Sequence, residues 1–220
     1  MKSIDIETVP NLNLVSALPD PEVKYGNTKD EAKRKIIEDE AKQKQIDDMA
    51  LSPYWGRICS VAWCDRELKG DYAVIDNVSD YEEIEIIKLC LSMCVPTHFN
   101  EPTIITFNGV RFDMPFIYKR AMLLSVELPT GSLPLRAFTK RYELIPHCDI
   151  AMEAVEWDLH KYQSLNFTSS GILGEKKIDV DVTKFHEMIE NGQQKEIGIY
   201  NLQDAELTMK LYNKMENYIF

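Results

Sequence analysis

The first ten residues, MKSIDIETVP (1–10), contain two isoleucines that alternate with two acidic side chains. Successive side chains of a β-strand point to opposite faces, so the isoleucines would enter the core while Asp5 and Glu7 share the other face. Two carboxylates placed this close together repel each other. The stretch therefore predicts a strand whose acidic face either lies at a sheet edge, where charges discourage aggregation, or holds a cation.

The composition is that of a folded protein with a core of its own. The chain has 220 residues, of which 45% are hydrophobic and 10% aromatic, so we expect a single domain over residues 1–220. No apolar stretch approaches the roughly 20 residues of a membrane span, and we expect a cytoplasmic protein with no membrane partner. The five cysteines lack the spacing of zinc or redox pairs and are predicted to be buried, reduced thiols.

The net charge of −11 argues against an obvious nucleic-acid partner, because proteins that bind a phosphate backbone usually gain affinity from Lys and Arg. Residues 111–147 differ from the rest of the chain, with six basic side chains against three acidic ones and a local charge of +3. A nucleic-acid partner would therefore depend on this basic patch or on bound cations.

Residues 11–53 stand apart from the other predicted elements. A stretch rich in Pro and Asn leads to a charged helix within residues 28–50, where Thr28 and Glu31 fit a capping box. Apolar side chains are sparse on this helix, which is therefore predicted to be mostly solvated. We interpret the segment as a helical surface insertion, with a substrate lid or a docking helix for a partner as the alternatives.

The rest of the chain predicts an α/β fold. Strands are expected at 56–65 and 71–78, joined as a hairpin, and then at 103–107 and 143–151. Helices are expected between the later strands and through the C-terminal third, with turns at 169–171 and 190–192. Antiparallel strands followed by alternating strands and helices indicate a mixed sheet with helices on both faces.

Two further acids stand in segments that are otherwise apolar. Asp113 follows a buried strand, and Asp204 interrupts an apolar stripe of helical spacing. The first could be only a helix N-cap, and the second could bond to a neighbouring hydroxyl group. Ionised groups are costly to remove from water, however, and no Lys or Arg stands beside Asp5, Glu7 or Asp204 in the sequence. Divalent cations would compensate all four acids at once.

Carboxylate oxygens are ligands that suit Mg²⁺ or Mn²⁺. Two such ions about 3.5–4 Å apart can activate a water molecule and stabilise the leaving oxygen of a phosphodiester. Two bound divalent metal ions would therefore explain the four acids.

Three short motifs carry a resemblance to a known family. DIETVP (5–10), NGVRFD (108–113) and YNLQDAEL (200–207) resemble, in this order, the three motifs of the DEDD superfamily of 3′–5′ exonucleases. Their order and intervals are similar to those of the proofreading domain of B-family DNA polymerases and its stand-alone relatives. The resemblance covers nearly the whole chain outside residues 11–53. It implies an RNase H-like α/β fold, with a mixed five-stranded sheet flanked by helices.

The resemblance also implies roles for single residues. The implied ligands of the two ions, Mg²⁺ or Mn²⁺, are Asp5, Glu7, Asp113 and Asp204. Tyr200 matches the tyrosine that orients the attacking water, and Ile199 stands where a sister subgroup has histidine, which excludes that variant. A phenol with a pKa near 10 is a poor base at neutral pH. Tyr200 is therefore expected to position the water rather than to deprotonate it.

Four residues are further candidates, for substrate contacts. Thr8 follows the acidic pair and would contact the terminal nucleotide, and Asn108 opens the second motif and would contact the sugar-phosphate near the cut. For each residue the alternative is that it only shapes a turn. Lys176 or Lys177 would meet a phosphate group, with a solvated lysine as the alternative. Asp149 is expected near the site without binding a cation.

These observations lead to one expected function and two rivals. We expect removal of nucleotides from the 3′ end of DNA. The DNA is expected to be single-stranded, because a narrow acidic cleft needs an unpaired terminus. We also expect a separate replication or repair protein as a partner. The first rival is the same reaction on RNA or short oligonucleotides, since nothing in the sequence is identified that senses a 2′-hydroxyl. The second is a catalytically silent nucleic-acid-binding or scaffold protein of the same fold. A nucleotide-binding switch lacks support, because no Gly-rich phosphate loop is present.

Overall fold

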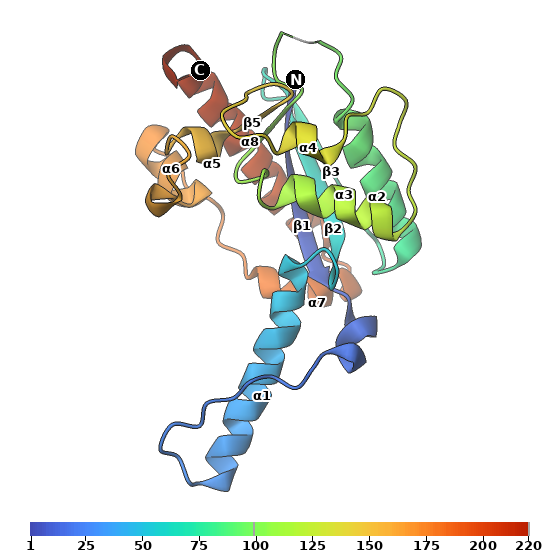
Figure 1. The fold of residues 1–220 in the computed structure, drawn as a ribbon, viewed down its shortest axis with the longest axis vertical. Helices are drawn as coiled ribbons and strands as arrows, with labels where there is room; N and C mark the ends of the chain where they lie inside the picture. The colour runs from blue at the N-terminus through green and yellow to red at the C-terminus, as the bar shows by residue number, and fades with distance from the viewer. Residues whose placement is uncertain (99, 220) are drawn as a thin grey trace.

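The structure, a computed structural model, describes residues 1–98 and 100–219 (Figure 1). Five strands form one sheet in the order β3-β2-β1-β4-β5. They are β1 (Lys2–Pro10), β2 (Gly56–Cys64), β3 (Gly70–Val74), β4 (Ile104–Thr106) and β5 (His147–Asp149). β2 runs antiparallel to both β1 and β3, whereas β4 runs parallel to both β1 and β5. The predicted mixed five-stranded sheet of an α/β fold is confirmed.

Strand β1 lies in the centre of the sheet, so the edge-strand explanation of its acids is wrong. Ile4 and Ile6 are buried in the core, and the intervening acids stand on the opposite face, where they are partly exposed. The pairing with β2 shifts between Glu7 and Thr8, where β2 contributes one extra residue. A bulge of this kind increases the local twist and turns the neighbouring side chains, here directly beside the acidic pair.

Strands β3 and β5 end earlier than predicted, because side chains take over the backbone hydrogen bonds there. β3 ends at Val74, and the Glu82 carboxylate accepts hydrogen bonds from the N–H groups of Asp76 and Asn77. β5 ends at Asp149, whose carboxylate accepts a hydrogen bond from Ala151 N at 3.0 Å and so starts a helix.

Helices cover both faces of the sheet (Figure 1). The longest are α1 (Glu31–Asp48), α2 (Asp80–Met93), α3 (Asp113–Leu123) and α8 (Gln194–Ile219). One apolar cluster joins Ile4 of β1 to Leu91 of α2 and Phe116 of α3. A second cluster joins Ile105 of β4 to Leu207 of α8. Burial of these two clusters holds the sheet between two helical layers and fixes α8 against β1.

Short helices fill the connections. They are α4 (Leu135–Phe138), α5 (Ile150–Glu153), α6 (Leu165–Ile172) and α7 (Phe185–Glu190), with 3₁₀ turns at Leu12–Ala17, Met49–Leu51, Leu159–Lys161 and Val182–Lys184. The turn predicted at 169–171 is wrong, because these residues continue α6, whose first turn is capped by the Ser164 side chain. A turn does follow α7, where Gly192 has a φ of 75°, the conformation that glycine adopts most readily.

Residues 11–53 form an arm, in which α1 projects from the body of the molecule (Figure 1). No side chain of α1 is buried, which agrees with the predicted solvated helix. The predicted cap is wrong: the side chain of Asp30 accepts hydrogen bonds from the N–H groups of Ala32 and Lys33. Because the helix begins at Glu31, Thr28 lies too far upstream to cap it.

Two composition-based expectations can be compared with the structure. All five cysteines are buried and free of disulfide bonds, as predicted. Among the described residues, the helices are too short or too polar to cross a lipid bilayer.

Candidate functional site

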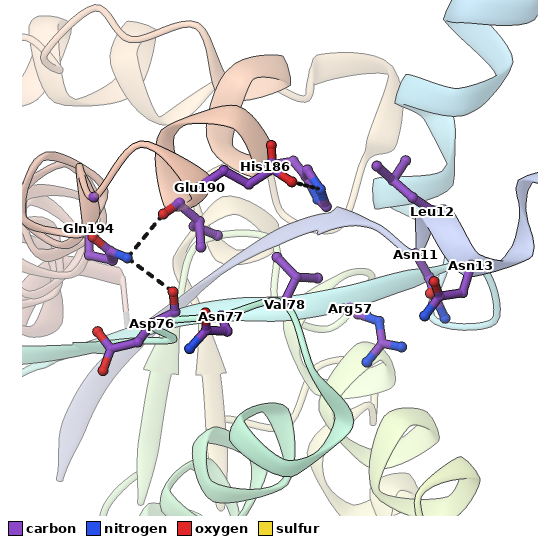
Figure 2. A pocket seen from close by; sticks show the side chains of 12 residues that line it. Asn11, Leu12, Asn13, Arg57, Asp76, Asn77, Val78, His186, Glu190 and Gln194 are labelled. Carbon is purple, nitrogen blue, oxygen red and sulfur yellow. Dashed lines mark hydrogen bonds and ion pairs between the residues drawn. The ribbon is translucent and has the colours of Figure 1, made fainter.

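One pocket gathers most of the side chains singled out by the motifs. This acidic pocket has a volume of about 420 Å³, and its lining includes Asp5, Glu7, Thr8, Asn108, Asp113, Lys177, Tyr200 and Asp204. A cavity of about 610 Å³, the strand-end pocket, is lined in part by Asn11, Arg57 and His186 and contains none of the predicted site residues (Figure 2). Size alone would favour the second cavity, but the grouping of titratable side chains favours the acidic pocket.

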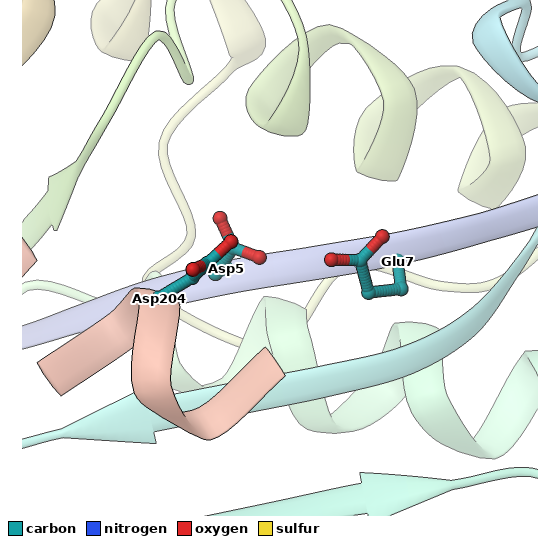
Figure 3. Close-up of side chains that lie close together, drawn as sticks. All are labelled: Asp5, Glu7 and Asp204. Atoms are coloured by element: carbon teal, nitrogen blue, oxygen red, sulfur yellow. The ribbon is translucent and has the colours of Figure 1, made fainter. Parts of the chain in front are cut away.

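Three carboxylates meet in the acidic pocket (Figure 3). Asp5 and Glu7 stand on the same face of β1, and Asp204 comes from α8, which packs on β1. One oxygen atom from each of the three carboxylates lies within 4.8 Å of the other two. Residues from the two ends of the chain are thus brought to one point by the packing of α8 on the central strand.

Asp113 lines the same pocket but stands outside the group formed by Asp5, Glu7 and Asp204. It is the first residue of α3, and its Oδ1 accepts a hydrogen bond from the backbone N–H of Ile6 at 3.1 Å. The N-cap position of α3 is Phe112, and the Asp113 carboxylate reaches β1, so the explanation of Asp113 as only an N-cap is wrong. The contact ties α3 to β1 between Asp5 and Glu7, and it leaves the second oxygen of Asp113 for another partner.

Burial raises the pKa of all four acids and is the largest cause in each case. The pKa rises to about 8 for Glu7, to about 7 for Asp113 and to about 6 for Asp204. For Asp5, burial is reinforced by the charges of the three other acids, and the pKa lies well above its usual value. The ionised carboxylates are therefore poorly compensated by the protein alone, and the site favours added positive charge.

The donor set fits hard divalent cations. Asp204 Oδ1 is buried and has no hydrogen-bond partner among the described residues. Several carboxylate oxygens at short separation are the ligands that Mg²⁺ and Mn²⁺ prefer. A cation bound there would satisfy the free oxygen of Asp204 and reduce the repulsion among the acids.

Part of the missing positive charge comes from Lys177, which is not a sequence neighbour of these acids. The Lys177 ammonium group contacts Asp204 Oδ2 and donates a hydrogen bond to the Tyr200 hydroxyl at 2.8 Å. Asn166 Oδ1 accepts a hydrogen bond from the backbone N–H of Lys177 at 3.1 Å and so fixes this segment beside α6. The lysine is distant from Asp204 in the sequence, so inspection of sequence neighbours did not find it.

Tyr200 stands one helical turn before Asp204 on α8 and is largely buried. Its ring packs edge-on against Phe185 of α7, with the ring centroids 5.7 Å apart. Burial is the main cause that raises the pKa of Tyr200 to about 12. The phenol therefore keeps its proton near neutral pH and can donate or accept a hydrogen bond in the pocket.

The loop of the second motif is held in place by Asp149. Its carboxylate accepts hydrogen bonds from the N–H groups of Asn108 at 2.8 Å and Val110 at 2.9 Å. Asn108 has a φ of 69°, and a Cβ atom at Gly109 would lie 2.3 Å from Thr106 Oγ1. The loop therefore requires the Asn-Gly pair. Asn108 Oδ1 is buried without a partner among the described residues and belongs to the lining of the acidic pocket.

The other predicted substrate contacts take different positions. Thr8 lines the acidic pocket, but its hydroxyl donates a hydrogen bond to Ala50 O at 2.7 Å and so ties β1 to the base of the arm. Lys176 is exposed and lines a neighbouring pocket together with Lys177 and Tyr200, outside the lining of the acidic pocket. Of the two lysines, only Lys177 lines the acidic pocket.

Asn201 is a residue of the site that the sequence reasoning missed. With its amide oriented so that the oxygen accepts from Ser60 Oγ at 2.9 Å, its nitrogen donates to Asp5 O at 3.1 Å and Asp5 Oδ2 at 3.2 Å. Asn201 is fully buried and therefore links α8 to both β1 and β2. A polar residue beside Tyr200 in the third motif was the available signal.

Comparisons with known proteins identify a family and relatives of this chain. Residues 51–219 match a family model described as a predicted 3′–5′ exonuclease related to the exonuclease domain of PolB. The chain is 30% identical over 151 residues to the DNA polymerase of Autographa californica nuclear polyhedrosis virus, a match that covers 61% of the chain and 15% of the polymerase. It is 27% identical over 219 residues to DNA polymerase 1 of Sulfolobus acidocaldarius, covering 95% of the chain and 22% of the polymerase.

The fold has a counterpart among solved structures. The family B DNA polymerase from the hyperthermophilic archaeon Pyrobaculum calidifontis matches with a TM-score of 0.62 and 15% sequence identity. The match covers 98% of this chain and 24% of that one, so the chain is similar to a fraction of a polymerase. Since the family model matches most of the chain, this protein belongs to the family of predicted 3′–5′ exonucleases related to the exonuclease domain of PolB.

Proposed function

We propose that this protein is a metal-dependent 3′–5′ exonuclease that hydrolyses phosphodiester bonds at the 3′ end of DNA. The observation that carries the proposal is the convergence of Asp5, Glu7 and Asp204, whose carboxylate oxygens lie within 4.8 Å of one another. Family membership supports the reaction class. The raised pKa values of the three acids support cation binding, because a cation would stabilise the ionised forms that burial disfavours.

Asp5, Glu7 and Asp204 would hold the cations, and Asp113 would complete the set through the oxygen that does not bind Ile6 N. Two bound Mg²⁺ or Mn²⁺ ions would supply activation of the attacking water and charge stabilisation of the leaving oxygen. Asn201 and the Ile6 amide orient these carboxylates before any ion arrives, which reduces the ordering needed at binding.

Tyr200 positions the attacking water and does not act as its base. Its pKa of about 12 keeps the hydroxyl protonated at neutral pH, and the edge-on packing against Phe185 fixes the ring. A hydroxyl held in this way can orient a water molecule toward the phosphorus atom by hydrogen bonding. Lys177 shares the hydroxyl and supplies positive charge to the same region of the pocket.

Substrate contacts follow from the free groups in the lining. Lys177 reaches the pocket with 21% of its side chain exposed and would meet a phosphate group of the substrate. Asn108 belongs to the lining of the acidic pocket and would contact the sugar-phosphate near the cut. Thr8 would contribute through its backbone, since its hydroxyl is bonded to Ala50. Lys176, at the neighbouring pocket, would meet a phosphate further along the strand.

The substrate is proposed to be single-stranded DNA. The relatives are named DNA polymerases, which favours DNA over RNA. The acidic pocket of about 420 Å³ has the size of a site for a small ligand and would admit one nucleotide more readily than a base pair. The chain spans 22% of DNA polymerase 1 of Sulfolobus acidocaldarius. We propose a role in replication or repair together with a separate protein partner.

Digestion of a 5′-labelled strand tests the proposal. The full chain is incubated with matched single-stranded DNA, double-stranded DNA or RNA, in the presence of Mg²⁺, Mn²⁺ or EDTA. We expect stepwise shortening of single-stranded DNA from the 3′ end with either metal and none with EDTA. Asp5→Asn serves as the inactive control, and Asp71→Asn, an exposed acid on β3, as the matched control that retains activity. Preferential shortening of RNA would overturn the substrate, and no shortening with either metal would overturn the reaction.

A further inference from the structure

A small cavity, the two-arginine pocket, lies beside the loop of the second motif. It has a volume of about 120 Å³, and its lining includes Val110, Arg111, Arg141 and Trp157. Asn108 of the same loop lines the acidic pocket, and the two cavities share no lining residue. Arg111 follows Asn108 so closely in the chain that their Cα atoms are at most about 11 Å apart. The loop therefore borders both cavities.

Two arginines supply all the charge of this lining, because the other lining side chains are neutral. Arg111 and Arg141 are exposed, and neither guanidinium group forms an ion pair or a hydrogen bond among the described residues. Of the neighbouring acids, Glu143 is already paired with Lys140 at 2.9 Å. In a chain with a net charge of −11, two uncompensated arginines at one cavity create a local positive potential, which attracts an anion.

The size of the pocket fits a phosphate group rather than a whole nucleotide. Its volume of about 120 Å³ lies below the roughly 300 Å³ at which small-molecule sites begin, but it is several times the volume of about 30 Å³ that a water molecule occupies. Guanidinium groups donate paired N–H bonds whose geometry matches phosphate oxygens. Both arginines can be reached from solvent, since their side chains are exposed. The pocket therefore favours a phosphate that belongs to a larger ligand on the surface.

An aromatic pair borders the same pocket. Trp157 lines it, and the indole is tilted by 52° against the ring of Tyr142, with the centroids 5.4 Å apart. Trp157 Nε1 donates a hydrogen bond to Glu153 Oε1 at 2.8 Å, which fixes the indole, whereas Tyr142 is 72% exposed. Both aromatic residues have a φ of 62°, a conformation that bulky residues rarely adopt and that is retained mainly at functional sites. Exposed aromatic rings beside arginines are typical of surfaces that bind single-stranded nucleic acid.

We propose that the two-arginine pocket holds a backbone phosphate of the DNA strand whose 3′ end lies in the acidic pocket, and that Tyr142 stacks on a base beside that phosphate. The inference rests on the proposed function for the identity of the strand and adds a second contact to it. The loop between the two pockets is held by Asp149, which accepts hydrogen bonds from the N–H groups of Asn108 at 2.8 Å and Val110 at 2.9 Å. A strand bound at both pockets is therefore held in a fixed position relative to the cleavage site.

Fluorescence anisotropy of a labelled oligothymidylate tests the inference, with the full chain in EDTA. Arg111→Gln and Arg141→Gln are each expected to weaken binding about tenfold, because each variant loses charged hydrogen-bond donors. In the double variant, the slope of log K against log salt concentration should also become shallower by about 0.7, since one phosphate is no longer neutralised. Tyr142→Ala should weaken binding about tenfold with an unchanged slope, because a stacked base carries no charge.

Arg136→Gln is the matched control. Arg136 is exposed on α4 in the same basic segment but does not line the pocket, so its loss should have a much smaller effect. An equal loss of affinity in Arg136→Gln would show general electrostatic attraction and contradict a built site. Absence of binding by the wild-type chain, or unchanged affinity in the double variant, would overturn the proposal. Binding that is lost in Lys176→Gln but kept in the double variant would place the strand beside α6 instead.

These outcomes are distinct from those of the digestion assay, because the anisotropy measurement requires no cleavage. Arginine-dependent binding without any metal-dependent shortening would overturn the proposed reaction and support this surface. Shortening that proceeds with binding insensitive to both arginines would support the reaction and overturn this surface.

Discussion

The ammonium group of Lys177 contacts the Asp204 carboxylate and joins the segment after α6 to the middle of α8. Burial alone would lower the pKa of Lys177, but Asp204 and the Tyr200 hydroxyl raise it above the usual value. The lysine is therefore held charged at the point where cations are proposed to bind. It acts as a tethered counter-charge for a group of acids that the core would otherwise leave uncompensated.

Replacing this counter-charge should destabilise the protein when no metal is present. Lys177→Met leaves Asp204 without its ion pair, so the melting temperature in EDTA is expected to fall. Added Mn²⁺ should narrow the difference from wild type, because the cation supplies the missing charge. Lys176→Met, at the exposed neighbouring position, is the matched control and should have little effect. A loss of stability that is equal with and without Mn²⁺ would contradict this role for Lys177.

The raised pKa values predict how stability depends on pH. In the folded protein the pKa is about 8 for Glu7 and about 6 for Asp204, above the ordinary values, mainly because both are buried. The native state thus binds protons more tightly than the unfolded state, and this contribution to stability is lost as pH rises through these values. We expect the melting temperature in EDTA to fall between pH 5 and pH 9 by differential scanning calorimetry.

Bound cations should counteract the fall in melting temperature with rising pH. Metal ions compete with protons for the same carboxylates, so the increase in melting temperature caused by Mn²⁺ should be larger at high pH than at low pH. Glu7→Gln removes one of the titrating groups and should flatten the profile in EDTA. A wild-type melting temperature that rises from pH 5 to pH 9 in EDTA, or a Mn²⁺ effect that shrinks with pH, would show that these acids do not carry the dependence.

Periodic patterns in the sequence predicted which residues share a face of a strand or helix. Contacts between residues that are far apart in the sequence became visible only in the structure. Alternation along β1 placed Asp5 and Glu7 on one face, and the helical stripe of α8 placed Asp204 beside the core. The contact between Lys177 and Asp204 joins separate elements, and so does the bond from Asn201 to Asp5, so neither leaves a local pattern. The family resemblance supplied the order of the motifs but not these supporting contacts.

Competition between neighbouring residues explains why the predicted cap of α1 and the predicted turn at 169–171 are wrong. Thr28 and Asp30 are both good helix caps, and the side chain nearer to the first turn makes the bond. The Ser-Ser-Gly run at 169–171 reads as a turn, yet the cap at Ser164 and the burial of Leu165 carry α6 through it. In both cases the packing of the folded protein decides which of two competing local patterns forms. A single sequence does not reveal that packing.

Asn201 is predicted to position Asp5. Asn201→Ala removes its bonds to the carboxylate and the backbone of Asp5, and loss of such a supporting contact typically costs about 10–100-fold in metal affinity or activity. Calorimetric titration with Mn²⁺ measures the affinity directly. Asn217→Ala, at an exposed position near the end of the same helix, is the control. An unchanged Mn²⁺ affinity in Asn201→Ala would remove this residue from the site.

Tyr200→Phe separates positioning of the water from binding of the metal. The variant keeps the ring and its packing against Phe185 but loses the hydroxyl. We expect exonuclease activity to fall about 10²-fold, the scale of a misplaced reactant, while Mn²⁺ affinity stays within about a factor of two to three, since the hydroxyl is not proposed as a ligand. Activity equal to wild type would exclude the proposed role of the hydroxyl.

Glu83 forms the centre of a buried ion network between α2, α3 and β2. It accepts hydrogen bonds from Arg120 Nε at 2.7 Å, Arg120 Nη2 at 2.6 Å and Ile58 N at 3.0 Å. Glu83→Ala would leave a buried guanidinium unpaired and should lower the free energy of unfolding by about 3–5 kcal/mol. Denaturant titration measures the change. Glu85→Ala, which breaks the exposed pair with Lys88, should cost less than about 1 kcal/mol.

The most direct test of the central claim is the anomalous diffraction of crystals soaked with Mn²⁺. We predict two peaks about 3.5–4 Å apart in the acidic pocket, coordinated by oxygen atoms of Asp5, Glu7, Asp113 and Asp204. The Lys177 ammonium group is expected to be displaced from Asp204. If Mn²⁺ binds elsewhere, or if the pocket stays without a peak while Lys177 keeps its contact with Asp204, then these carboxylates do not form a metal centre and the proposed nuclease mechanism is wrong.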